Sequence, residues 1–245
     1  MYNNSYADYA EILEELKRTN RIHPISDCKD RDIFITIRHD VEFSVLKALK
    51  MAAIEFEKGI QTAYCFQIEN GSYNPFSEQN KAFIRCIHEM GHDIGLHYRQ
   101  TQNGRYVPIE IAKQIDEMTE KLQIPVKLFS THRPKPETEY EKYEVEDAVN
   151  AYGEDFFERT ENTDGVKIKY ISDSKFRWNY GYPSTELLNY LKCQILIHPF
   201  QWSEKRQTMS ECFKGLEAEK NSLLKSIFEN EFMRYKEIKD YNEIK

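Results

Sequence analysis

The sequence predicts an α/β fold in which parallel strands alternate with helices. Short apolar runs alternate with amphipathic stretches, and the runs at 33–37 and 194–197 are almost continuously apolar, as strands buried on both faces are. Four runs also end in a histidine, in segments 33–40, 92–98, 127–133 and 194–199. Ligands of α/β barrels and open α/β sheets bind at the carboxyl ends of the strands. The four histidines therefore indicate one pocket at that edge.

Helix and strand signals follow one another in the order that βα units require. We expect helices at 6–17, 44–58, 78–90, 109–122, 143–152 and 183–191, and strands at 33–38, 61–68, 92–97, 127–131, 166–172 and 194–197. Gly59 and Gly91 end the second and third helices, and Ser77 is the expected N-cap of the third. One or two amphipathic helices follow residue 204. We therefore expect a single domain over 1–245, with a motif-bearing core at 33–202 and a helical extension at 204–245.

Charge and composition argue against a nucleic-acid partner. The net charge is −7, whereas phosphate-binding surfaces are basic. The 16 tyrosines and 14 phenylalanines suit carbohydrate stacking as well as ordinary packing. The five cysteines are scattered without a CxxC pair, so we expect free thiols, and any metal site should use histidine and carboxylate ligands. With no leader-like start and no apolar run of about 18 residues, we expect a cytoplasmic protein without a membrane span.

Ionisable residues are concentrated where the first strand meets the polar edge, in segment 38–42. Charge directly after an apolar run is costly unless it is paired, so His39 and Asp40 are candidates for a base and a metal ligand. Hydrogen bonding to the loop backbone is the alternative. His97 belongs with the other histidines at strand ends. His92 lies about 16 Å from it along an extended strand and on the opposite face, so we expect a structural role for His92.

Further candidates follow the later strands. Arg133 keeps its proton and can bind a carboxylate with two hydrogen bonds, with Asp40 or Asp173 as its natural partner; a surface salt bridge is the alternative. Asp173 either holds a catalytic histidine in its tautomer or forms an Asx turn. His198 ends an apolar strand with Trp202 close behind. Such surroundings can tune an imidazole for proton transfer.

These segments, in this order, resemble the polysaccharide deacetylase family, also called the NodB homology domain, over about residues 33–202. They are closest to a divergent branch whose first motif reads His-Asp-Val-Asp/Glu. The usual first motif is a base aspartate followed by a metal-ligating aspartate, and His39 and Asp40 hold those positions here. His97 matches the first histidine of the second motif. The second histidine would fall at Thr101, which is not an imidazole.

The remaining motifs also have counterparts. Arg133 matches the third motif, whose arginine orients the base, and Asp173 with Trp178 resembles the fourth. His198 matches the fifth, whose histidine protonates the leaving group. The resemblance implies a distorted (β/α) barrel, usually of seven strands, and metal-assisted hydrolysis of an N-acetyl group on a sugar.

The resemblance also implies a divalent metal, which we expect to be zinc. A hydrolytic zinc site has three protein ligands and a water. Asp40 and His97 supply two ligands, and His132 is the best candidate for the third. The alternative is a metal-free pocket in which four histidines transfer protons: His39, His97, His132 and His198.

Tyr98, Trp178 and Trp202 are the expected contacts for a carbohydrate substrate. We expect a hydrolase that removes an acetyl group from a carbohydrate or a sugar-nucleotide precursor. Two alternatives stay open: a metal-independent hydrolase of a cyclic amide, and a carbohydrate-binding protein without turnover. The sequence does not indicate the oligomeric state.

Overall fold

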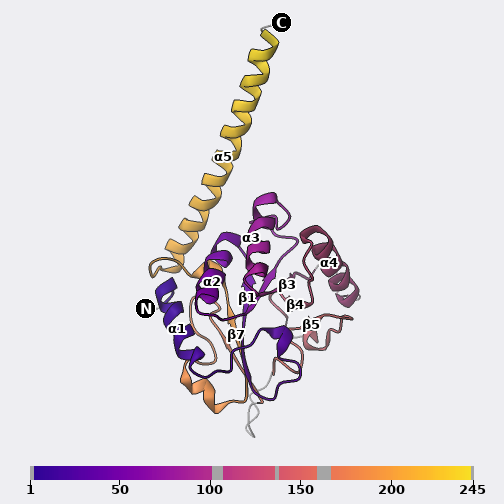
Figure 1. The fold of residues 1–245 in the computed structure, drawn as a ribbon, viewed down its shortest axis with the longest axis vertical. Helices are drawn as coiled ribbons and strands as arrows, with labels where there is room; N and C mark the ends of the chain where they lie inside the picture. Colours follow the sequence, from indigo (N-terminus) through magenta and orange to yellow (C-terminus); the bar gives the residue numbers. More distant parts are fainter. Residues whose placement is uncertain (1–2, 101–106, 136–137, 159–166, 244–245) are drawn as a thin grey trace. The chain divides into compact units, whose positions relative to one another are not determined.

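The computed structural model describes residues 3–100, 107–135, 138–158 and 167–243 (Figure 1). Its contacts divide the chain into two units, Met1–Arg206 and Gln207–Lys245. The first unit contains a seven-stranded parallel sheet with helices against it, and the second consists mainly of one helix. The predicted fold class, a parallel α/β sheet curled as a distorted barrel, is confirmed.

All seven strands run in the same direction. The strands are β1 (Phe34–Val41), β2 (Ala63–Phe66), β3 (Asp93–Tyr98), β4 (Leu128–Thr131), β5 (Val149–Asn150), β6 (Ile168–Ser172) and β7 (Lys192–Ile197). Their order across the sheet is β5-β4-β3-β2-β1-β7-β6, and each neighbouring pair is parallel. Because every strand is parallel, all carboxyl ends meet at one edge of the sheet.

The helices largely match the amphipathic stretches of the sequence. They are α1 (Tyr6–Lys17), α2 (Val45–Glu57), α3 (Glu78–Glu89), α4 (Val107–Leu122) and α5 (Met209–Glu243), with short 3₁₀ turns at Ile25–Asp27, Tyr140–Lys142, Thr185–Asn189 and Pro199–Gln201. The prediction of a helix at 143–152 is wrong, because this stretch contains turns and the two-residue strand β5. Asn150 on β5 donates to the backbone carbonyls of Tyr140 and Tyr143, which ties the preceding turn to the strand instead of to a helix.

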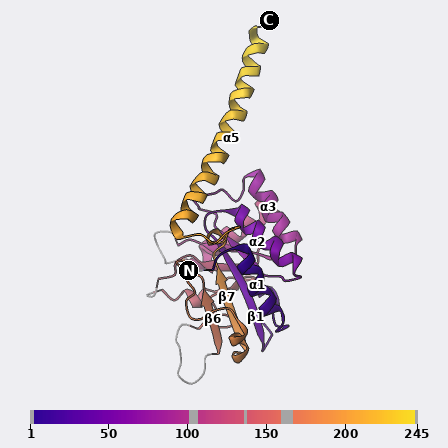
Figure 2. The ribbon, with the colours of Figure 1, turned by 90° about the vertical axis from the view of Figure 1, so that its left-hand side faces the viewer.

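Helices α1 to α4 cover one face of the sheet, and Figure 2 shows α1, α2 and α3 on the same side of β1. Successive residues of a strand point to opposite faces. Ile35 and Ile37 of β1 face the helices, where they pack in one cluster with Tyr9 of α1 and Met51 of α2. The odd-numbered residues of β1 therefore lie in the helix-covered core.

The other face of the sheet is concave and holds a smaller apolar cluster that includes Phe34, Cys65 and Leu128. A side chain at Gly95 would place its Cβ 2.8 Å from the sulfur of Cys65, so only glycine fits here. The segment 151–157 crosses this face. Gln194 of β7 donates to its backbone carbonyls at Ala151 and Phe156, at 2.9 and 2.7 Å. Segment 151–157 therefore connects the two sides of the curled sheet.

Helix α5 makes up most of the second unit. Its 35 residues extend about 52 Å at 1.5 Å per residue. It is one continuous helix, whereas the sequence predicts either one or two helices after residue 204. Among the described residues, no helix has both the length and the apolar character that a bilayer crossing requires.

Candidate active site

Glu42, His97 and His132 meet at the carboxyl edge of the sheet. Their ligand atoms all lie within 4.8 Å of one another, and they form the one such group of potential metal ligands among the residues that the structure describes. His97 Nε2 is 3.0 Å from His132 Nδ1, which is 3.1 Å from Glu42 Oε1. Bonds of about 2.0–2.1 Å to a tetrahedral zinc ion separate its ligand atoms by about 3.3 Å. This spacing and the two-nitrogen, one-oxygen donor set fit a divalent ion.

A hydrogen-bonded chain holds His97 in the orientation that this cluster needs. Ser130 Oγ donates to Asp40 Oδ1 at 2.9 Å, so it accepts a hydrogen bond from His97 Nδ1 at 2.8 Å. The proton on Nδ1 leaves the lone pair of Nε2 directed at Glu42 and His132. Such a partner on the second ring nitrogen is usual for histidines that bind metals.

Asp40, the expected metal ligand, is not part of the cluster of Glu42, His97 and His132, but contacts it through His97. Its carboxylate pairs with the buried guanidinium of Arg38, at 3.1 Å from Nε and 3.3 Å from Nη2, and lies 3.6 Å from His97 Nδ1. Burial raises the pKa of Asp40, but Arg38 and then His97 lower it more, so the pKa lies below its usual value. The carboxylate in the cluster is Glu42, two residues further along and on the same face. The i, i+2 alternation of a strand is the signal that could have identified Arg38 and Glu42.

The protonation states of the cluster suit metal binding. Burial lowers the pKa of His97 to about 4, and the neighbouring Asp40 offsets only part of that shift. For Glu42, burial raises the pKa, but the hydrogen bond with His132 and the nearby histidines lower it more. At neutral pH the cluster therefore presents a neutral imidazole and an ionised carboxylate, which are the forms that bind metals.

His198 and Asp173 form a second cluster of ionisable side chains at the same edge of the sheet. His198 Nδ1 is 2.6 Å from Asp173 Oδ1, and the indole N–H of Trp202 donates to Oδ2 at 3.0 Å. Burial lowers the pKa of His198, but the buried carboxylate of Asp173 outweighs it and raises the pKa to about 9. The charge of His198 in turn lowers the pKa of Asp40 and Glu42. A protonated imidazole therefore lies within electrostatic reach of the cluster.

His39, the expected base, lies on the opposite face of β1 from Asp40. It is fully buried, its Nε2 donates to Glu55 Oε1 at 2.7 Å, and its ring stacks on Tyr64 at 4.2 Å between centroids. Glu55 also accepts hydrogen bonds from the hydroxyls of Tyr9, Tyr64 and Thr62. Adjacent strand residues alternate between faces, so His39 and Asp40 do not enter one pocket.

Arg133 also lies apart from the expected partners. It is exposed and its backbone has φ 47°, whereas the arginine that contacts Asp40 is Arg38. Tyr98 faces away from the pocket as well. It is fully buried on the helix-covered face and donates to Glu110 of α4 at 2.5 Å.

The two tryptophans lie near the Asp173 side of the site. Trp202 is fully buried, so its indole positions Asp173 and cannot present a face to a sugar. Trp178 is half-buried, with its ring 6.2 Å from that of Trp202. Another aromatic ring lies near His198: the centroid of Phe200 is 6.2 Å from that of His198 and 4.7 Å from that of Phe43.

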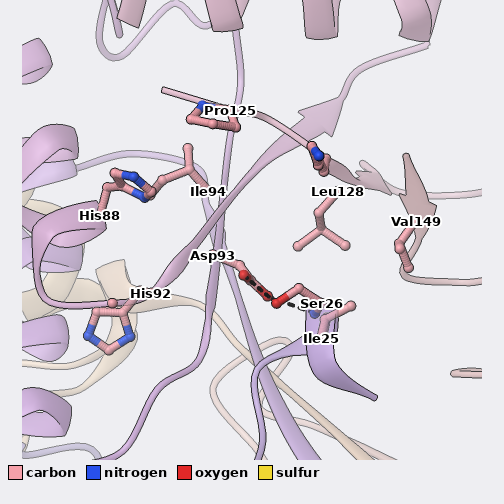
Figure 3. A pocket seen from close by; sticks show the side chains of 11 residues that line it. Ile25, Ser26, His88, His92, Asp93, Ile94, Pro125, Leu128 and Val149 are labelled. Carbon is pink, nitrogen blue, oxygen red and sulfur yellow. Dashed lines mark hydrogen bonds between the residues drawn. The ribbon is translucent and has the colours of Figure 1, made fainter. Parts of the chain in front are cut away.

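A cavity of about 320 Å³ lies at the opposite, amino ends of the strands (Figure 3). Figure 3 shows Asp93 hydrogen-bonded to Ser26 in its wall. His92 also lines it: Nδ1 accepts from the Thr62 amide at 3.1 Å and Nε2 donates to the Ala52 carbonyl at 3.2 Å. The structure places His92 in a structural role, remote from His97, as the sequence indicated.

No protein-family model matches the chain, and no curated protein matches it. Solved structures that are similar to it include the chitin deacetylase from Colletotrichum lindemuthianum, at 18% identity over 44% of this chain and 49% of that one, with a TM-score of 0.35. A carbohydrate esterase family 4 pseudoenzyme from Bacillus anthracis is 9% identical over 78% of this chain and 62% of that one, with a TM-score of 0.45. A family 4 acetyl xylan esterase from Clostridium thermocellum, in complex with a cobalt ion, is 12% identical over 77% and 83%, with a TM-score of 0.38.

The chain spans about half to two thirds of the length of the first of these proteins. The similar structures are described as carbohydrate esterases and deacetylases, and some of them as pseudoenzymes.

Proposed function

We propose that the chain is a metal-assisted hydrolase that removes an acyl group, acetyl above all, from a carbohydrate or a sugar-nucleotide precursor. One observation carries the proposal: a potential metal-binding triad, Glu42, His97 and His132, lies within electrostatic reach of a protonated His198. In the hydrolysis of an amide or ester, water adds to the acyl carbon and the bond to the amine or hydroxyl breaks; an electrophile at the carbonyl oxygen assists the first step, and an acid that protonates the leaving group assists the second.

Each side chain of the site has a distinct part in this proposal. Glu42, His97 and His132 would hold a divalent ion, with zinc best matched by the donor set. When bound, such an ion acts as a Lewis acid that polarises the acyl carbonyl. Asp40, through Ser130, fixes the tautomer and the orientation of His97.

His198 is the proton donor to the departing amine or hydroxyl. With Nδ1 engaged by Asp173, the Nε2 proton is the one available for transfer. Trp202 and the backbone amide of His198 both donate to Asp173, which holds that carboxylate in place. The acyl-sugar substrate class is supported by the sequence motifs and by the substrates named for the similar structures, chitin and acetyl xylan.

Acetate release by the purified full-length chain tests the proposal. The chain is supplied with zinc or cobalt and incubated with N-acetylated sugar nucleotides, chitooligosaccharides and acetylated xylan. We expect at least one substrate to release acetate, and His198→Ala and Glu42→Gln to lose about 100-fold or more in kcat/KM. His88→Ala, at an exposed histidine on α3, is the matched control and should keep full activity.

The other outcomes separate the alternatives. Activity that survives complete metal removal but is lost in His198→Ala would indicate the metal-independent hydrolase. Sugar binding without acetate release would indicate a binding protein. Full activity of His198→Ala would contradict the proposed role of that residue.

A further inference from the structure

Helix α5 carries a continuous exposed apolar stripe. Its members are Leu223, Leu224, Ile227, Phe228, Phe232 and Tyr235, which are 43% to 70% exposed. At about 100° per residue, these side chains fall within one half of the helix circumference. A helix with such a stripe derives most of its stability from packing that stripe against a partner.

The central part of the stripe is symmetric about the point between Lys225 and Ser226. Leu224 and Ile227 are equally distant from that point, and so are Leu223 and Phe228. When two copies of α5 lie antiparallel and cross there, Leu224 of one copy lies level with Ile227 of the other, and Leu223 lies level with Phe228, whereas Phe232 lies level with Glu219. Such a contact is isologous, as in a twofold-symmetric dimer, and it closes on itself.

Two charged residues interrupt the stripe, and they obey the same symmetry. Lys220 and Glu231 lie near the centre of the apolar face and are equally distant from the crossing point. In an antiparallel pair, Lys220 of each copy faces Glu231 of the other. In a parallel pair, like charges would face each other, which is unfavourable. Within the helix, Lys220 lies 3.2 Å from the adjacent Glu219 in a half-buried pair. Glu231 lies 3.5 Å from Arg234 in an exposed pair, which contributes little.

We propose that α5 pairs antiparallel with α5 of a second copy of this chain, and that Lys220 and Glu231 set the orientation. The occupant of the stripe is a second copy because the four central apolar residues and the two interrupting charges all complement the helix's own reversed sequence. The contact leaves the strand-end site of each copy with its own complete set of residues.

Sedimentation velocity of the full-length chain between 1 and 100 μM tests this inference. We expect a concentration-dependent dimer. Leu224→Glu, in the centre of the stripe, should raise the dimer dissociation constant about tenfold or more. Met233→Glu is the matched control, because Met233 is 53% exposed but lies on the opposite side of the helix. It should leave the dissociation constant within about twofold of wild type.

A charge exchange tests the orientation and does not depend on burying a charge. Lys220→Glu should weaken the dimer about tenfold, and the double variant with Glu231→Lys should restore it, because opposite charges face each other again. A parallel pair predicts no such rescue. A chain that stays monomeric up to 100 μM would overturn the proposal, whether or not the stripe binds another protein or a lipid vesicle. A dimer that Leu224→Glu leaves intact, or that Met233→Glu disrupts equally, would overturn it as well.

Discussion

Replacement of Glu55 by glutamine should destabilise the fold in a pH-dependent way. Glu55 lies on α2 with a side chain that is fully buried, and its two oxygens accept from His39, Tyr9, Tyr64 and Thr62. Burial raises the pKa of this carboxyl, but the facing imidazole of His39 and the hydrogen bonds lower it more, to about 2. The ionised form is therefore strongly preferred in the folded protein.

The pKa difference sets the magnitude. From the usual value of 4.5 to about 2 is roughly 2.5 units, and each unit corresponds to about 1.4 kcal/mol, so ionised Glu55 contributes about 3 kcal/mol. Because the folded pKa is depressed, this contribution is complete above pH 4.5 and is lost as the pH falls towards 2. Glutamine, which carries no charge, cannot reproduce it.

Urea unfolding of wild type and Glu55→Gln at several pH values between 7 and 3 measures this contribution. We expect a difference of about 3 kcal/mol in the free energy of unfolding at pH 7, shrinking below pH 4.5. Glu57→Gln, at an exposed position on the same helix, is the control and should change stability by less than about 0.5 kcal/mol. A difference below about 1 kcal/mol at pH 7, or one that is independent of pH, would refute the reasoning.

Three further predictions concern the strand-end site. With the pKa of His198 at about 9, kcat/KM should fall as the pH rises through 9, and Asp173→Asn should move that fall towards pH 6.5; an unmoved pH profile would rule out the pair as the proton donor. Arg38→Met leaves the buried Asp40 carboxylate uncompensated and should cost about 3–5 kcal/mol in urea unfolding, and a loss below about 1 kcal/mol would contradict the pairing. Trp202→Phe keeps an aromatic ring, although a smaller one, and removes the donor to Asp173, so it should cost at least about 1.5–3 kcal/mol by the same measurement; unchanged stability would show that this hydrogen bond is dispensable.

Much of the fold was predictable because apolar runs and helix signals act locally. Helix 6–17 begins and ends where the sequence placed it, and the Ser77 side chain caps α3 as expected. The failures occurred where local signals are weak. Strand β5 has two residues, too few for a pattern, and it exists because it pairs with β4. The charged stretch at 143–152 likewise has no clear pattern, and the sequence predicts a helix where the structure has turns and β5.

The sequence predicts the location of the site better than it predicts which side chains make up the site. The prediction that His97, His132 and His198 lie at one edge of the sheet follows from parallel strands. The roles expected for His39 and Asp40 rest on the charge that follows the apolar run and on the motif along the chain, and neither takes into account that neighbouring strand residues face opposite ways. The side chains of Asp40 and Glu42 point to the concave face of the sheet, whereas that of His39 points to the helix-covered face. That Arg38 is the partner of Asp40 follows from the same alternation.

Metal titration of the purified, metal-free protein tests the central claim most directly. Cobalt, followed by its visible absorption and by isothermal calorimetry, should bind at one ion per chain in wild type and in His39→Gln, whose side chain faces the helices. Glu42→Gln should weaken that binding at least tenfold, because it removes a proposed ligand. Absence of binding in wild type, or binding by Glu42→Gln as tight as in wild type, would contradict the account.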